Sequence, residues 1–120
     1  MQLKADRKLI ISNILTNSSG ACSATIERVS GRLIAIQFIL DTLASGAVDV
    51  SVVESNFGST IFTKTNAAAD VLWRPRVQLQ DTSGSNISFY EPILLIDATL
   101  TITVAQGGDT KTGKLKFWME

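Results

Sequence analysis

The chain has no histidine, one cysteine and two prolines in 120 residues, and only 18% of its residues are charged. Without histidine it lacks the side chain that titrates near neutral pH and that most often binds metals. The single cysteine, Cys22, can form neither an internal disulfide nor a Cys/His zinc site. It lies in an alternating apolar pattern, which favours a small buried side chain over a nucleophile. A Ser-His-Asp or Cys-His site is therefore impossible. We expect no enzyme activity, no metal and no cofactor.

The charges also exclude some partners. Eleven basic and eleven acidic residues cancel, and no run of Lys or Arg exceeds two residues. A nucleic-acid binder needs a basic stripe, which this chain lacks. No apolar run is long enough to cross a membrane, and residues 1–6 lead into no signal-peptide core. The acidic side chains are scattered at predicted turns and outer faces, so most are interpreted as solvated surface charges.

Residues that favour strands are abundant. Val, Ile and Thr make up more than a quarter of the chain, and long helix-forming runs are missing. Turn residues recur roughly every ten positions, as in antiparallel sandwiches and barrels. We predict an all-β fold in a single domain, residues 1–120, built as an antiparallel β-sandwich, jelly-roll-like, with about eight short strands. The expected strands are 8–15, 22–28, 32–40, 47–53, 60–64, 71–80, 87–90 and two in a C-terminal hairpin.

Several breaks between these strands have a local cause. Residues 16–20, 41–46, 56–58 and 81–86 are predicted turns or loops. Residues 65–70 are predicted as a loop with one helical turn at 67–69. Pro75 places its segment at a sheet edge or starts the strand after the proline, and Pro92 is expected to interrupt the strand that begins at Ile87. Residues 93–96 are apolar on both parities, which indicates a segment that crosses beneath another element.

The second and third strands are predicted to form a hairpin. A three-residue loop at Val29-Ser30-Gly31 sets Ile26 opposite Ile34 and keeps the apolar side chains together. This loop needs a left-handed residue at Gly31, so we expect Gly31→Val to be costly.

The C-terminal residues give the clearest strand signal. Leu100, Ile102 and Val104 alternate with threonines, and after a glycine-containing turn Leu115, Phe117 and Met119 alternate with Lys114, Lys116 and Trp118. This pattern predicts a hairpin. Two registers are open, with Leu115 opposite either Val104 or Leu100, and both place the same residues on the dry face.

A few side chains are candidates for contacts with other chains. Trp118 is predicted to point outward with the lysines, where it is either an isolated exposed aromatic or part of an interface. Arg74-Pro75-Arg76 either grips an acidic partner or forms a solvated edge. The interface candidates are Trp118, Trp73, Arg74, Arg76 and Met119.

Three motifs carry a resemblance to a known group. They are Ser30-Gly31-Arg32-Leu33, Trp73-Arg74-Pro75-Arg76 and Val104-Ala105-Gln106-Gly107-Gly108-Asp109-Thr110-Lys111-Thr112-Gly113. The third has a faint likeness to a phosphate loop but lacks its spacing and a following helix, so a plain hairpin turn is the preferred interpretation. Together the motifs resemble small virion structural proteins of tailed bacteriophages, over residues 10–117. The C-terminal residues 116–120 depart from that pattern, so no role for Trp118 is carried over.

The resemblance implies a capsid cement or decoration protein, made in the host cytoplasm and located on the capsid surface. Its expected partners are copies of itself, in a homo-oligomer expected to be a trimer, and the major capsid protein. Neither nucleic acid nor a membrane is an expected partner. The alternative is a receptor- or carbohydrate-binding module of a phage tail or fibre. That alternative needs exposed aromatic side chains, for which Trp73, Tyr90 and Trp118 are the candidates.

Overall fold

The computed structural model describes residues 8–56 and 58–120, and these form eight antiparallel strands with no helix. Consequently, the described residues contain no helix that could span a membrane. The all-β prediction is confirmed. The strands are β1 (Lys8–Leu15), β2 (Cys22–Ile39), β3 (Val48–Glu54), β4 (Ser59–Ala67), β5 (Val71–Trp73), β6 (Arg76–Gln80), β7 (Asn86–Ala105) and β8 (Thr112–Met119).

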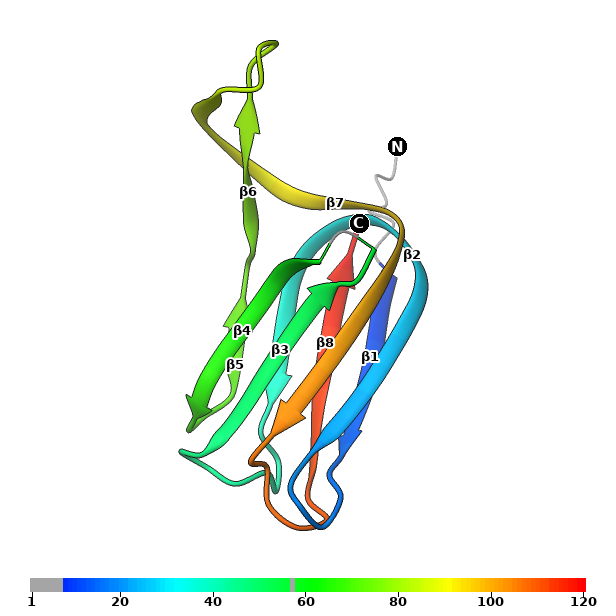
Figure 1. Ribbon diagram of the computed structural model, residues 1–120, viewed down its shortest axis with the longest axis vertical. Helices are drawn as coiled ribbons and strands as arrows, with labels where there is room; N and C mark the ends of the chain where they lie inside the picture. Colours follow the sequence, from blue (N-terminus) through cyan, green and yellow to red (C-terminus); the bar gives the residue numbers. More distant parts are fainter. Residues whose placement is uncertain (1–7, 57) are drawn as a thin grey trace, which may run out of the picture.

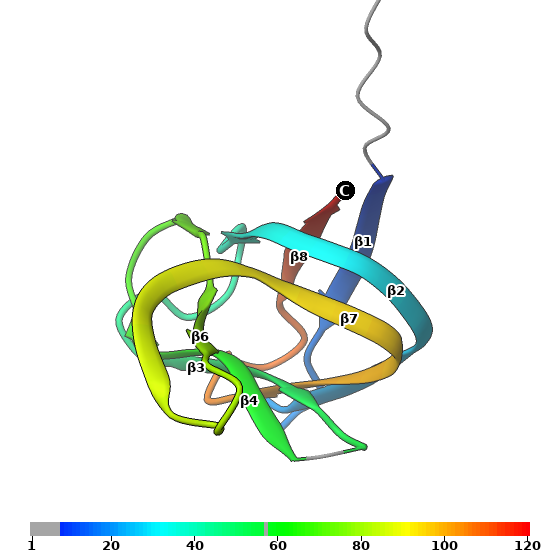
Figure 2. The same cartoon turned by 90° about the horizontal axis from the view of Figure 1, so that it is seen from above.

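The sheet is folded on itself into two facing layers, as Figures 1 and 2 show. Its pairing order is β1-β8-β2-β7-β3-β4, with β5 added to β2 and β6 added to β7. The long strand β2 belongs to both layers: its first part pairs with β7, and its last part pairs with β8 and β5. One layer is therefore β1-β8-β2-β5 and the other is β2-β7-β3-β4.

The core lies between these layers and follows the period-two pattern of the strands. Phe38, Leu115 and Phe117 from one layer are fully buried, as are Val50 and the other inward side chains of the opposite layer. Those opposite-layer residues are Val48, Val52, Phe62, Leu100, Ile102 and Val104. The predicted dry faces of the two C-terminal segments are thus confirmed.

The predicted hairpin within residues 22–40 is wrong, because the whole segment is the single strand β2. Its register on β7 shifts between Ile26 and Val29 and again between Val29 and Gly31. Arg28 and Gly31 adopt positive φ angles of 58° and 125°. These bulges bend the strand from one layer into the other without reversing it, as strands that turn sandwich corners do.

The predicted C-terminal hairpin is also wrong. β7 pairs with β2 and β3, whereas β8 pairs with β1 and β2 in the other layer. The loop after Ala105 therefore crosses between the layers instead of closing a two-strand turn. Neither predicted register occurs, although Leu115, Phe117 and Met119 are buried as expected. Alternation determined the buried face but held no information about the partner strand.

Smaller differences concern the predicted breaks between strands. β7 continues through Pro92, which pairs with Arg76 in a two-stranded segment with no third strand to need its N–H. β4 runs to Ala67 in place of the predicted helical turn. Pro75 separates β5 from β6, as one of the two interpretations proposed. The predicted turn at 56–58 includes Phe57, which lies outside the described residues, as do residues 1–6.

Candidate functional site: an apolar arm and its pocket

A two-stranded arm extends from one end of the sandwich (Figure 1). It consists of β6 and the first part of β7, residues 76–92, with a tip loop at 81–85. In this loop the Asp81 carboxylate accepts hydrogen bonds from the Ser83 N–H (2.9 Å), the Ser83 hydroxyl (2.8 Å) and the Ser85 N–H (3.0 Å). These bonds, that of the Ser83 side chain first, hold the pKa of Asp81 below its ordinary value of 3.8.

The outward side of β7 carries an apolar row where the arm joins the body. Register is regular here, with Tyr90 opposite Gln78, Pro92 opposite Arg76 and Leu94 opposite Arg32. Alternate residues therefore share one side of the strand. Tyr90 is 61% exposed, Leu94 61% and Ile96 76%. We call Tyr90, Pro92, Leu94 and Ile96 the outer stripe.

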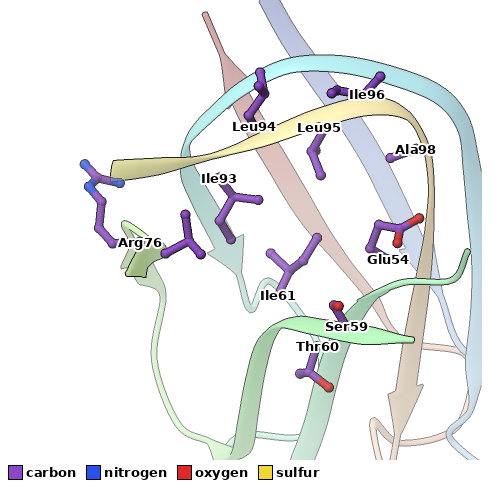
Figure 3. Close-up of a pocket in the computed structure, with 11 residues that line it drawn as sticks. Glu54, Ser59, Thr60, Ile61, Arg76, Ile93, Leu94, Leu95, Ile96 and Ala98 are labelled. Carbon is purple, nitrogen blue, oxygen red and sulfur yellow. The ribbon is translucent and has the colours of Figure 1, made fainter. Parts of the chain in front are cut away.

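The inward side of the same segment covers a cavity of about 430 Å³. Ile93 and Leu95 extend from β7 into it, opposite Ile61 of β4 (Figure 3). Leu94 and Ile96 also line the cavity, although their side chains point to the other side of the strand. The lining is apolar except at a few positions: Glu54, Ser59, Thr60 and Arg76. We call this cavity the root pocket, because it lies at the root of the arm.

Glu54 supplies a carboxylate to this apolar lining. It ends β3 and is 7% exposed, and its Oε1 accepts a hydrogen bond from the Asn56 N–H at 3.0 Å. Carboxylates are seldom so buried without hydrogen-bond donors or counter-charges. The root pocket therefore combines apolar walls with one strong hydrogen-bond acceptor.

A second apolar surface lies on the outer side of the layer that contains β8. Trp118 is half-buried and directly opposite Leu9 of β1, and Ile11 is opposite Lys116. Gln37 of β2 pairs with Lys116 on one side and with Leu72 of β5 on the other, so Leu72 continues the same row across the sheet. Leu9, Ile11 and Leu72 are 40%, 49% and 48% exposed. We call Leu9, Ile11, Leu72 and Trp118 the Trp118 face.

The structure places the predicted interface candidates in different environments. Trp73 is half-buried, and its ring lies edge-on to that of Phe62, with 4.8 Å between the ring centroids. This contact closes the edge of the sandwich between β4 and β5. Met119 is 2% exposed, so its side chain belongs to the core and offers a partner no surface. Arg74 is exposed. The Arg76 guanidinium donates to the carbonyl oxygens of Pro75 (2.9 Å) and Ile34 (3.3 Å).

The three aromatic residues considered for sugar stacking do not form one platform. Trp73 faces Phe62 inside the sandwich edge, Trp118 lies on the outer side of β8, and Tyr90 lies on the arm. Sequence reasoning did not single out Leu94 and Ile96, although both are exposed members of the outer stripe. The available signal was the apolar run on both parities at residues 93–96, which was interpreted as a buried crossing.

The glycine-rich segment is structural. Gly107 donates its N–H to the Gly20 carbonyl oxygen at 2.9 Å, and the Gly107 carbonyl oxygen accepts from the Ala44 N–H at 2.9 Å. The loop is thus tied to the β1–β2 turn and to the loop before β3. Among the described residues, no group of three or more His, Cys, Asp or Glu side chains is arranged to hold a metal ion.

No family model matches this chain, and no curated protein matches it. Among solved structures, the chain is similar to the crystal structure of the infectious bursal disease virus VP2 subviral particle. The sequences are 17% identical, the TM-score is 0.37, and the match covers 96% of this chain but only 32% of that protein. A likeness at this TM-score does not establish a shared fold.

Proposed function

We propose that this protein is a virion structural protein of the capsid cement or decoration type, which assembles with copies of itself and binds the major capsid protein of a tailed bacteriophage. The resemblance over residues 10–117 supports this proposal from the sequence. The supporting observation from the structure is the segment Ile93–Leu94–Leu95–Ile96, which is apolar on both sides but covered on only one.

The argument rests on what such a strand requires. Strands that are apolar on both faces are normally buried on both faces. Here Leu95 is 4% exposed, whereas its neighbours Leu94 and Ile96 are 61% and 76% exposed. The arm beyond them has only two strands, and an isolated two-stranded ribbon is at best marginally stable in water. A neighbouring subunit over the outer stripe would supply the missing cover.

We assign the Trp118 face to the capsid shell. It is a separate surface, on the outer side of the β1-β8-β2-β5 layer, and it combines Trp118 and three exposed aliphatic side chains with Lys114 and Lys116. Tryptophan is enriched among the residues that dominate interface energies, and the lysines favour an acidic partner patch. Two separate surfaces allow self-contact and shell contact at once.

The test is co-sedimentation with phage heads assembled without this protein. Wild-type protein should sediment with the heads at a fixed ratio to the major capsid protein and raise the temperature at which they rupture. Trp118→Ala should weaken head binding and leave the mass of the free protein unchanged. Thr63→Ala, an exposed change on β4, is the matched control and should bind like wild type. Absence of wild-type binding to heads would contradict the proposed function.

A further inference from the structure

We propose that the root pocket of one copy receives Tyr90 from the arm of a second copy, so that subunits join head to tail. The proposal rests on the proposed function, in that it names the self-contact of an oligomer. Its donor and acceptor are both present on each chain: an exposed aromatic side chain on the outer stripe, and an apolar pocket beneath the same strand.

The chemistry of the pocket selects a phenol. Ile61, Ile93 and Leu95 form apolar walls that suit an aromatic ring, and Glu54 lines the pocket beside them, on the side of Ala98 (Figure 3). In the proposed contact the Tyr90 hydroxyl donates to the Glu54 carboxylate, which has about four lone-pair sites, in addition to the contacts that Glu54 already makes. Tyrosine joins an apolar ring to a hydroxyl that needs a partner when buried.

Phe89 is the competing side chain on the arm. It is 67% exposed and is the neighbour of Tyr90 on the same strand, so it points to the other side. Its ring has no hydroxyl for Glu54, and it is not part of the outer stripe. Tyr90 shares its side of β7 with Leu94 and Ile96, which would pack on the rim of the neighbour's pocket once the ring is inserted.

The contact has a suitable size and direction. A standard interface removes about 800 Å² from each partner, and a buried aromatic side chain accounts for about 150–250 Å². Tyr90, Leu94 and Ile96 would therefore supply roughly half of one partner's share. Tyr90 does not line the pocket of its own chain, so donor and acceptor are two different patches, which meet at Leu94 and Ile96. Such heterologous contacts form closed rings when the rotation between subunits closes.

The experiment mixes two variants that each lack one half of the contact. Tyr90→Ala removes the donor but keeps the pocket. Ile61→Trp fills the pocket but keeps the donor, and Thr60→Trp, at an exposed position on the pocket rim, repeats this test without altering a partly buried residue. Mass is measured by analytical ultracentrifugation, and far-UV circular dichroism confirms that each variant is folded.

Each variant alone should be monomeric, with the dissociation constant raised by about 30-fold or more. An equimolar mixture of the two should form a one-to-one heterodimer, because one intact contact remains possible. Tyr90→Phe, which loses only the hydroxyl, should weaken self-association by roughly 10- to 100-fold. Phe89→Ala is the control and should keep the wild-type mass.

Other outcomes distinguish a failure of the Tyr90 contact from a failure of the proposed function. If Tyr90→Ala keeps the wild-type mass, or if the mixture stays monomeric, the exchange of Tyr90 is overturned while head binding by wild-type protein still supports the proposed function. If Thr60→Trp keeps the oligomer but no longer binds heads, the pocket holds a capsid subunit and the inference is overturned. A monomeric wild-type protein that also ignores heads would overturn both proposals.

Discussion

The hydroxyl of Thr16, the first residue after β1, donates a hydrogen bond of 2.6 Å to the carbonyl oxygen of Gly108, 92 residues later in the loop that follows β7. The same hydroxyl oxygen accepts from the Lys111 N–H at 2.8 Å, and the Thr16 N–H donates to the Lys111 carbonyl oxygen at 2.9 Å. Thr16 is 3% exposed. One buried threonine therefore joins two of the loops that connect the layers at this end of the sandwich, β1–β2 and β7–β8.

We expect Thr16→Val to lower the free energy of unfolding by about 1–3 kcal/mol, because it keeps the shape of the side chain but leaves buried backbone groups without their partner. Urea unfolding followed by fluorescence measures the change. Thr16→Ser keeps the hydroxyl and should recover most of the loss. Equal stability of Thr16→Val and wild type would show that the hydroxyl does not hold the loops together.

Gly31 marks the point where β2 bends between layers. Its φ is 125°, and a Cβ there would lie 3.1 Å from the Glu120 carbonyl oxygen. We expect Gly31→Val to cost about 2 kcal/mol or more, from backbone strain and from the displaced C-terminus. The predicted cost therefore remains, although its cause is a bend and not a hairpin loop.

Gly46 provides a comparison position that has a positive φ but no close neighbour. It also has a positive φ, of 82°, but a Cβ there would have nothing within 4 Å. Thermal unfolding of Gly31→Ala and Gly46→Ala should show the larger loss of stability at Gly31. Equal losses would mean that neither the larger φ of Gly31 nor its contact with Glu120 adds to the cost.

The edge between β4 and β5 depends on the perpendicular contact of Phe62 and Trp73. A double-mutant cycle with Phe62→Leu and Trp73→Leu should give a coupling energy of about 0.5–1.5 kcal/mol. Independent effects of the two substitutions would show that the rings do not stabilise one another. Because Trp73 is engaged here, Trp73→Leu should lower stability without weakening any surface contact of the folded protein.

The tip of the arm should respond to acid. The folded pKa of Asp81 lies below the ordinary value of 3.8, so the ionised form is favoured in the folded loop. Its stabilising effect is present above pH 3.8 and is lost as the pH falls through the lower folded pKa. NMR titration of the Ser83 and Ser85 amide signals should show a transition below pH 3.8, and Asp81→Asn should abolish it. A transition at or above pH 3.8 would contradict this reading of the loop.

Local patterns predicted much of the fold. Alternation at Leu100, Ile102 and Val104 correctly placed the dry face, and Pro75 correctly marked a break. Pairing was not predictable, because the same alternation serves a hairpin and two strands in opposite layers. The turn-forming residues around Gly31 produce a bend in β2 and not a reversal of the chain. β2 continues as one strand across the bend because it pairs with β7, and this pairing joins residues that are distant in sequence.

Less of the candidate site than of the fold could be predicted from the sequence. Residues 93–96 were visible as apolar on both sides, but only the structure shows that one side is left uncovered and that the other side lines a pocket containing Glu54. Trp118 was identified from its position among lysines, and its place opposite Leu9 follows from a strand pairing that the sequence did not indicate. The burial of Met119 follows from the same alternation that was used to define the dry face.

The central claim is that the outer stripe is covered by another copy of the chain. The most direct test compares the solution masses of wild-type protein and the Leu94→Glu/Ile96→Glu double variant at the same micromolar concentration. The wild-type protein should have a mass that is a multiple of the chain mass, and the folded double variant should have the mass of one chain. A wild-type monomer, or a double variant with the unchanged oligomeric mass, would contradict the claim.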